Sequence, residues 1–198
     1  MTARWPTAAG CDTLAVALGA NLGDPGATLL AVRPLLAELL LPLAEPSLVA
    51  PFSRLLWSPL FRTVPVGGPP EQPDYLNAVV LLEGMRPDPD PLALLLELQD
   101  LERRFGRERR ERWGPRLLDL DLLWCGEQRC RHGELELPHP RLAERAFVLA
   151  PLAAIDPQLV PHLPDQPAIR CGERLAALLA AGGEPPPQRL PPRPGWPE

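Results

Sequence analysis

The segment 118–124 constrains the fold of this chain most, because apolar residues alternate along it with two carboxylates. A period of two residues predicts a β-strand. Asp119 and Asp121, the acidic pair, then share one face of the strand, about 7 Å apart. The residues predicted on the opposite, buried face are Leu118, Leu120, Leu122 and Trp124. The chain must therefore build a sheet with one covered face and one face on which acidic groups can lie.

The acidic pair requires partners, because aspartate is unfavourable in strands. Mg²⁺ is one candidate, since it takes oxygen ligands from one or two carboxylates, from waters and from substrate phosphates. The alternative is a solvated strand face on which the carboxylates pair with nearby arginines. The two interpretations both stay open on this motif alone.

An arginine-rich segment lies directly before the acidic strand, with seven arginines and two glutamates between residues 103 and 116. Arg103, Arg104 and Arg110 are explained by a helix end, since cations complement the helix dipole and Gly106 is a typical stop. Other arginines of the segment are predicted to bind phosphate, because guanidinium groups bind phosphate oxygens bidentately. These are Arg107, Arg109 and Arg116. We expect this loop to close over a bound nucleotide.

Composition excludes several classes of protein. All twenty basic residues are arginine, so a P-loop and a Schiff-base lysine are both impossible. The net charge of −5 disfavours nucleic acid and membrane surfaces as partners. No uninterrupted apolar run of transmembrane length is found, and the four cysteines have no C-x-x-C spacing. We predict a cytoplasmic protein with free thiols and a small anionic ligand.

The length of 198 residues suits one domain. We assign it to residues 13–183, preceded by a loose extension over residues 1–12. The last segment, residues 184–198, holds seven prolines, and a composition of this kind predicts a disordered or polyproline-like tail.

Hydrophobic periodicity within the domain predicts the order β, α, β, β, α, β. The predicted segments are a strand at 14–18, a helix beginning within 21–25, an extended segment at 49–57, a loop at 61–73, a strand at 75–83, a helix at 91–105 and the acidic strand. We expect the segments 49–57 and 75–83 to pair. The order predicts an α+β fold, a ferredoxin-like sandwich with an antiparallel sheet, helices on one face and the active site on the other. A short extended segment at 135–137, a Pro-His-Pro turn and helices at 147–155 and 172–181 would follow.

Four segments together resemble one family, 6-hydroxymethyl-7,8-dihydropterin pyrophosphokinase of folate biosynthesis. They are ALGANLGDP at 17–25, FRTVPVGGPPEQPDYLNAVV at 61–80, RERWGPRLLDLDLL at 110–123 and LPHPRLAERAFVLAPL at 137–152. The resemblance implies transfer of the β,γ-pyrophosphoryl unit of ATP to the pterin hydroxymethyl oxygen, with release of AMP. It also implies two Mg²⁺ ions, with ATP as co-substrate.

The resemblance also implies a role for individual residues. Asp119 and Asp121 match the metal ligands and, with Arg107 and Arg109, the catalytic set. The residues that match ATP contacts are Gln99, Glu102, Arg107, Arg109, Arg116, Leu122, His139 and Arg145. The residues that match the pterin site are Thr63, Pro65, Val66, Tyr75, Asn77, Trp113 and Phe147. Tyr75 and Phe147 would stack on the pterin ring, and Trp113 could instead belong to a loop that closes over ATP.

Some positions depart from the family pattern. Glu134 and Glu136 stand where some relatives present Arg and Thr toward ATP, and Ala20 stands where many members have Ser. Two rival classes stay open: another Mg²⁺-dependent nucleotide enzyme on a ferredoxin-like core, and a non-enzymatic sandwich that binds RNA or a small molecule. The enzyme is expected to be a monomer.

Overall fold

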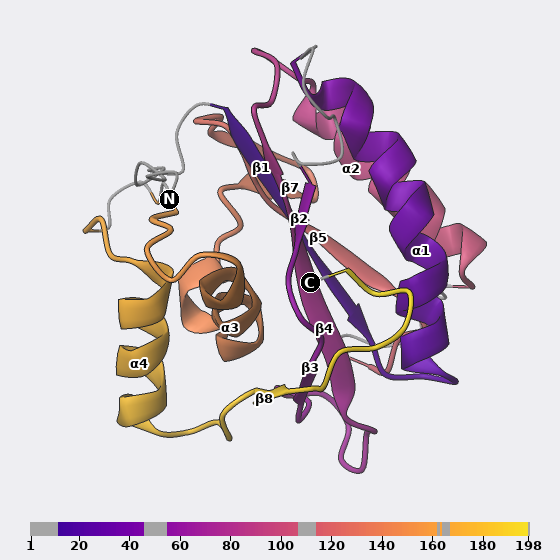
Figure 1. Ribbon diagram of the computed structural model, residues 1–198, viewed down its shortest axis with the longest axis vertical. Coiled ribbons are helices and arrows are strands. Elements are labelled where there is room, and N and C mark those ends of the chain that lie inside the picture. Colours follow the sequence, from indigo (N-terminus) through magenta and orange to yellow (C-terminus); the bar gives the residue numbers. More distant parts are fainter. Residues whose placement is uncertain (1–11, 46–54, 107–113, 162, 164–166, 198) are drawn as a thin grey trace.

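The computed structural model describes residues 12–45, 55–106, 114–161, 163 and 167–197. A central sheet is covered on one face by α1 and α2 and on the other by α3, and α4 packs on the outer side of α3 (Figure 1). The helices are α1 (Pro25–Leu40), α2 (Pro91–Arg104), α3 (Ala146–Ile155) and α4 (Cys171–Ala181), with short 3-10 turns η1 (Leu41–Leu43) and η3 (Leu142–Glu144). The strands are β1 (Thr13–Ala20), β2 (Leu55–Trp57), β3 (Phe61–Thr63), β4 (Tyr75–Glu83), β5 (Asp119–Cys125), β6 (Cys130–His132), β7 (Leu135–Leu137) and β8 (Gln188–Arg189).

The main sheet confirms the predicted α+β, ferredoxin-like fold. Its strand order is β5-β1-β4-β3-β8, with β2 also paired to β4, and every pairing is antiparallel. The predicted pairing of the segment before Trp57 with β4 is confirmed for residues 55–57. The loop predicted at 61–73 was wrong at its start, because Phe61–Thr63 forms β3 and pairs with β4. Such a short strand shows no periodicity, and its long-range partner stabilises it.

The helices α1 and α2 begin where the sequence predicts. Asp24 caps α1 by accepting a hydrogen bond from the N–H of Ala27 at 2.9 Å, and Asp90 caps α2 through the N–H groups of Leu92 and Ala93. Both caps are followed by a proline at the first helical position, where its missing N–H costs nothing. Gly106 follows α2 with φ of +83°, a conformation that favours glycine.

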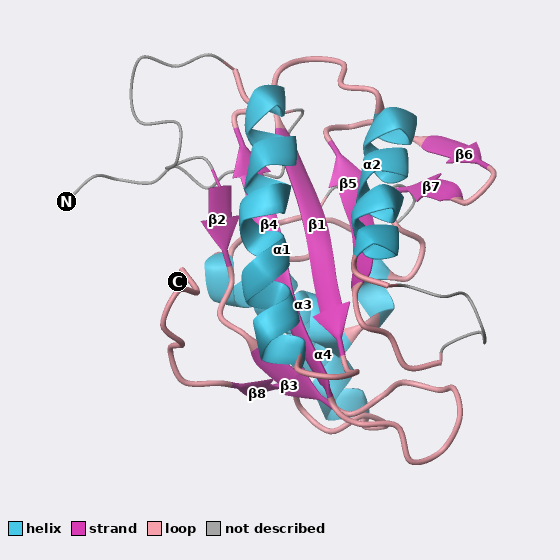
Figure 2. Ribbon diagram, turned by 90° about the vertical axis from the view of Figure 1, so that its right-hand side faces the viewer, coloured by secondary structure: helices cyan, strands magenta, loops and turns pink. Residues whose placement is uncertain are grey.

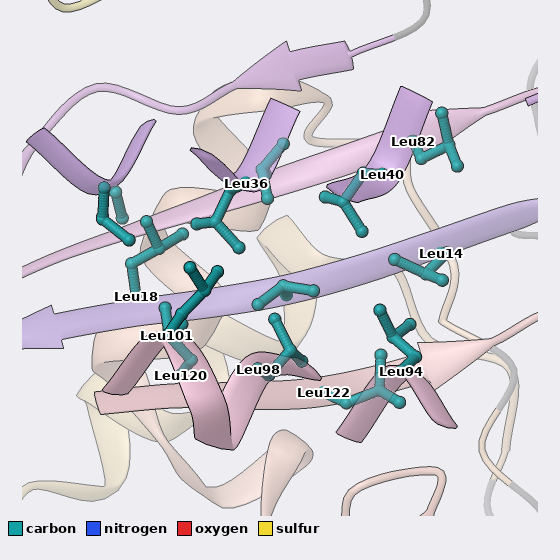
Figure 3. Close-up of a cluster of buried hydrophobic side chains, with 14 of the residues drawn as sticks. Leu14, Leu18, Leu36, Leu40, Leu82, Leu94, Leu98, Leu101, Leu120 and Leu122 are labelled. Atoms are coloured by element: carbon teal, nitrogen blue, oxygen red, sulfur yellow. The ribbon is translucent and has the colours of Figure 1, made fainter. Parts of the chain in front are cut away.

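The larger hydrophobic core lies between these two helices and the sheet. Figure 3 shows leucines of α1 and α2 facing leucines of β1, β4 and β5. The labelled residues are Leu14, Leu18, Leu36, Leu40, Leu82, Leu94, Leu98, Leu101, Leu120 and Leu122. By length and composition alone, residues Pro25–Leu43 could cross a membrane. In the fold, however, Leu29, Val32, Leu36 and Leu40 of this segment are fully buried against the sheet.

The other face of the sheet was predicted to be free for the active site, and it is free only in part. A second core cluster covers much of it, in which Val148, Leu149 and Leu152 of α3 pack on Ala15 and Val79. These positions explain why all eight residues of β1 are buried. The site must therefore occupy the remaining part of this face.

Trp124 corrects the predicted alternation of the acidic strand. Leu118, Leu120 and Leu122 lie in the larger core as expected, but Trp124 belongs to the second cluster on the opposite face. The register between β1 and β5 shifts at Ala15/Val16, opposite Leu122 and Trp124. An irregularity of this kind re-aims the side chains that follow it, and the sequence does not signal it.

The proline-rich tail was predicted to be disordered or polyproline-like and unable to pack, whereas part of it pairs with the sheet and packs on the core. Residues 188–197, here termed the C-terminal strap, pair with β3 through β8 and then run toward α1 (Figure 1). Trp196 is only 6% exposed and belongs to the larger core. Long-range pairing and one buried aromatic residue therefore hold a segment whose composition alone predicts disorder.

Figure 2 shows α1 and α2 side by side over the sheet and the separate ribbon of β6 and β7 beside α2. The predicted extended segment at 135–137 is confirmed as β7, and the two later helices as α3 and α4. Cys125, Cys130 and Cys171 are free, as predicted. Residues 1–11 and 46–54, and with them most of the predicted N-terminal extension, lie outside the described residues.

Candidate active site

A pocket of about 1030 Å³ lies on the part of the sheet face that α3 leaves open. Its floor is a row of paired residues across four strands: Asp119 of β5 pairs with Gly19 of β1, Gly19 pairs with Asn77 of β4, and Asn77 pairs with Phe61 of β3. The antiparallel register therefore brings residues from distant segments to one place. A volume of this size is at the upper end of the range for small-molecule sites.

Gly19 leaves room for the polar floor of the pocket. A Cβ atom at this position would lie 2.9 Å from Oδ1 of Asn77, which is closer than real contacts allow. The Asn77 amide, buried at 6% exposure, donates to Oγ1 of Thr63 at 2.7 Å. The backbone of β1 and the short strand β3 thus orient one amide between them.

The acidic pair lies at the opposite end of the pocket, with an arginine on each carboxylate. Arg116 donates to Asp119 through Nη1, and Arg145 Nη1 donates to Asp121 Oδ2 at 3.1 Å. Burial by itself would lower the pKa of Arg116, but Asp119 and, more weakly, Asp121 reverse this and raise the pKa above its ordinary value. This end therefore combines two carboxylates with two permanent cations, all half-buried.

Arg145 connects the acidic pair to an aromatic side chain. Its guanidinium carbon lies 5.3 Å from the ring centroid of Phe147, within the range of a cation–π contact. Its Nη1 also lies 3.5 Å from Nε2 of His139. Because Phe147 follows Arg145 at the start of α3, one short segment reaches both the charged and the aromatic parts of the pocket.

His139 is held as a neutral imidazole. Burial, reinforced by the charges of Arg145 and Arg141, lowers its pKa from 6.5 to about 4. The backbone N–H of Arg141 donates to Nδ1 at 3.2 Å, so the neutral ring carries its proton on Nε2, which lies 4.0 Å from Asp121 Oδ2. At neutral pH this residue can donate a hydrogen bond but adds no positive charge.

Glu102 of α2 holds the backbone of the acidic strand. Its side chain is 2% exposed, and Oε1 accepts a 2.7 Å hydrogen bond from the N–H of Leu120, the residue between the two aspartates. On the same helix, Gln99 donates to Oε2 of Glu134 at 3.0 Å. The helix therefore contributes one buried and one exposed polar group to this side of the pocket.

Asn21 is a structural residue of the pocket that sequence reasoning did not assign to the site. Its buried side chain accepts from the N–H of Arg116 at 2.7 Å and donates to the carbonyl of Pro73 at 3.0 Å, so it joins two loops that border the pocket. The backbone N–H groups of Asn21 and Leu22 also donate to the carbonyl of Arg116. A polar residue directly after a fully apolar strand was the available signal.

The structure brings together most of the residues predicted for the site. Those that line the pocket are Thr63, Pro65, Val66, Tyr75, Asn77, Gln99, Glu102, Arg116, Asp119, Asp121, Arg145 and Phe147. His139 stands behind Asp121 and Arg145. Leu122 is the exception, because its side chain is buried in the larger core and only its backbone can face a ligand. Arg107, Arg109 and Trp113 lie outside the described residues.

The donor set suits Mg²⁺ better than a soft metal. Within the described residues, no three His, Cys, Asp or Glu side chains cluster as an all-protein metal site would require. Two carboxylates on one strand face, open to the pocket, fit an ion that takes its other ligands from waters and phosphates.

The comparisons with known proteins agree on one family. Residues 15–157 match the family model described as 7,8-dihydro-6-hydroxymethylpterin-pyrophosphokinase. The chain is 42% identical over 166 residues to the 2-amino-4-hydroxy-6-hydroxymethyldihydropteridine pyrophosphokinase of Pseudomonas aeruginosa, covering 84% of this chain and 89% of that protein. It is 40% identical over 150 residues to the protein of the same name from Synechocystis, covering 76% of this chain and 69% of the relative.

Solved structures support the fold. A crystal structure titled as HPPK-DHPS in complex with substrates superposes with a TM-score of 0.58 at 12% identity, over 86% of this chain. A second, HPPK-DHPS of Plasmodium falciparum with pteroate, has a TM-score of 0.56. This chain spans 44% of the length of each of these two proteins. At this identity the likeness establishes the architecture only.

Proposed function

The chain belongs to the 7,8-dihydro-6-hydroxymethylpterin-pyrophosphokinase family, and we propose how its pocket divides that family's reaction among individual residues. The enzyme transfers pyrophosphate from ATP to hydroxymethyldihydropterin in folate biosynthesis. The observation that carries the residue assignment is that one pocket is lined both by the charged residues Asp119, Asp121, Arg116 and Arg145 and by the aromatic and amide side chains of Tyr75, Phe147 and Asn77.

Asp119 and Asp121 hold two Mg²⁺ ions in this proposal. When bound, such ions offset the negative charge of a triphosphate and favour in-line displacement at phosphorus. The two side chains are suited to the task because they project from one face of β5 and line the pocket. Their orientation is supported from behind by the hydrogen bond of Glu102 to the Leu120 backbone.

Arg116 and Arg145 bind the phosphate chain, together with Arg107 and Arg109. In the structure Arg116 and Arg145 already lie on the acidic pair, so they are near the place where a metal-bound triphosphate would lie. Guanidinium groups can keep one hydrogen bond to a carboxylate and direct others to phosphate oxygens, since each has five N–H donors. These arginines are therefore assigned to binding and to charge compensation during transfer.

The remaining nucleotide contacts are assigned to Gln99, Glu102, His139 and the backbone of Leu122. Gln99 and Glu102 line the side of the pocket formed by α2. His139 is neutral and carries its proton on Nε2, so it can donate to a phosphate oxygen at neutral pH. Because the side chain of Leu122 is buried, its contribution is limited to peptide groups.

The pterin is assigned to the part of the pocket lined by aromatic and amide side chains, next to the acidic pair. Tyr75 and Phe147 would face the flat heteroaromatic ring, and Asn77 would form hydrogen bonds with the donor and acceptor groups along its edge. Thr63, Pro65 and Val66 form the adjoining wall. Trp113 is assigned to the same site or to the loop that closes over ATP. The protein is further proposed to work as a cytoplasmic monomer, which is consistent with a pocket lined by one chain.

Product analysis tests this function. The purified protein is incubated with ATP, Mg²⁺ and 6-hydroxymethyl-7,8-dihydropterin, with controls that omit each component in turn. Pyrophosphoryl transfer predicts AMP and the pterin diphosphate in equal amounts, only in the complete mixture. ADP in place of AMP would contradict the assignment and indicate simple phosphoryl transfer.

A further inference from the structure

We propose that the C-terminal strap positions the pterin-facing wall of the pocket, with Trp196 as its anchor. The pterin-facing wall denotes residues 63–66, which follow directly from β3. The assignment of this wall to pterin rests on the proposed function. The role of the strap rests on separate observations, which are its contacts with the segment 57–62 and with α1.

The strap supplies the outer hydrogen-bonding partner of β3. On its inner side, this three-residue strand pairs with β4. On its outer side Phe61 pairs with Arg189 and Arg62 with Gln188, and the N–H of Leu190 donates to the carbonyl of Leu60 at 2.8 Å. A strand of three residues has few hydrogen bonds of its own, so the second partner restricts its motion substantially.

Trp196 contacts the short connection between β2 and β3. Both strands pair with β4, and Ser58 lies between them, fully buried. The indole Nε1 of Trp196 donates to the carbonyl of Ser58 at 2.8 Å, and its ring packs edge-to-face on Trp57 with a centroid distance of 5.5 Å. The carbonyl of Ser58 lies in a buried connection between two strands and needs a hydrogen-bond donor, because an unsatisfied buried polar group costs about 1–3 kcal/mol.

The strap is held at its far end by α1. Arg193 packs directly on Gly26, where an added Cβ atom would lie 1.6 Å from the arginine Nη1. The turn at Gly195, with φ of +83°, lies next to Leu30 of α1 and leads into Trp196, which is buried in the larger core. The strap is thus anchored at one end by the pairing of β8 with β3 and at the other by Arg193 and Trp196, which makes it a brace beside β3 (Figure 1).

The brace acts on the pocket through Thr63. This residue ends β3, is 9% exposed, and receives the hydrogen bond of the Asn77 amide. Val64 and Val66, which follow, line the pocket and are 40% and 41% exposed. A shift of β3 therefore moves the wall and the Asn77 partner together, while the acidic pair lies on β5, separated from β3 by the two strands β4 and β1. Loss of the anchor should weaken pterin binding selectively.

The test uses full-length variants in steady-state kinetics, with each substrate varied at saturation of the other. Trp196→Ala should raise the pterin KM at least about tenfold, with kcat and the ATP KM within about twofold of wild type. Trp196→Phe should have a smaller effect in the same direction, because it loses the Nε1 donor and part of the ring but keeps an aromatic ring in the core. Leu40→Ala is the matched control: it opens a cavity in the same core at the end of α1, so it should lower the Tm without changing the pterin KM.

Each outcome decides between the two proposals. An unchanged pterin KM in an active Trp196→Ala protein would overturn the role of the strap, as would equal changes in all three kinetic constants. If Trp196→Ala fails to fold, Leu190→Pro, which removes the N–H bonded to Leu60, should give the same selective rise in pterin KM, and no rise would overturn the proposal. Absence of AMP with the wild-type protein would instead overturn the proposed function.

Discussion

Glu102 and Leu120 are joined by a buried hydrogen bond of 2.7 Å, from the N–H of Leu120 to a carboxylate oxygen of Glu102. Leu120 is the residue between Asp119 and Asp121, so this contact fixes the peptide on which both aspartates depend. A carboxylate that is 2% exposed and bonded to backbone is expected to orient its neighbours even if it also approaches a ligand. Glu102 could therefore act by orienting the acidic strand or by contacting the ligand, and substitutions can distinguish these two functions.

Glu102→Gln should retain more activity than Glu102→Ala. Glutamine keeps an oxygen that can accept from Leu120, whereas alanine leaves this N–H unsatisfied at a cost of about 1–3 kcal/mol. We expect Glu102→Ala to lower kcat/KM for Mg·ATP more than tenfold and to lower the Tm. Measurement of both quantities for both variants checks this, and equal losses in the two would show that the charge of Glu102 matters rather than its hydrogen bond.

Asp119→Asn and Asp121→Asn should each lower turnover at least about a hundredfold. An amide is a poor ligand for Mg²⁺, so less of the metal charge that would stabilise the triphosphate is held in the pocket. Both variants should also require more Mg²⁺ for half-maximal rate. Asp100→Asn is the control, because Asp100 is exposed on α2 and pairs, among the described residues, with the neighbouring Arg103. Near-normal rates from either variant at low Mg²⁺ would contradict the metal assignment.

Asn21→Ala should destabilise the protein by about 2–3 kcal/mol, because it removes two hydrogen bonds from a buried site. Asn21→Asp keeps the acceptor for the N–H of Arg116 and loses only the donor to Pro73. Denaturant unfolding should therefore rank the free energies as wild type, then Asp, then Ala. A ranking with Ala above Asp would indicate that the contact to Arg116 contributes little.

His139 should make stability depend on pH. Its pKa is lowered to about 4 in the folded chain from 6.5, so between these values the unfolded chain binds a proton that the folded chain does not. The contribution of neutral His139 to the free energy of unfolding is present in full above pH 6.5. It is lost as the pH falls toward 4, by a total on the order of 3 kcal/mol. His139→Gln should flatten the fall in unfolding free energy between pH 6.5 and 4.5, measured without substrates.

The control for that prediction is His132→Gln, since His132 is exposed on β6. We expect the pH profile of this variant to follow that of the wild type. If His139→Gln and wild type lose stability in parallel over this range, the imidazole is not held neutral by burial.

Local patterns in the sequence were sufficient for the elements that carry the site. Strand and helix periods, together with the Asp24–Pro25 and Asp90–Pro91 starts, predicted β1, α1, β4, α2 and β5, because caps and periodicity act within a few residues. The motif around Asp119 and Asp121 indicated the family, and the pocket contains most residues that the resemblance implied.

Tertiary structure decided what local patterns cannot encode. The docking of α3 on half of the sheet face, the turn of Trp124 to the opposite face and the ordering of the strap by Trp196 all depend on partners far along the chain. Asn21 acquired its role only when residues 73 and 116 were brought to it. Such contacts arise from packing and hydrogen-bond satisfaction across the whole fold. The sequence by itself therefore determined the secondary-structure elements and the chemistry of the site residues. Only the tertiary structure determined which of these residues lie on the same face.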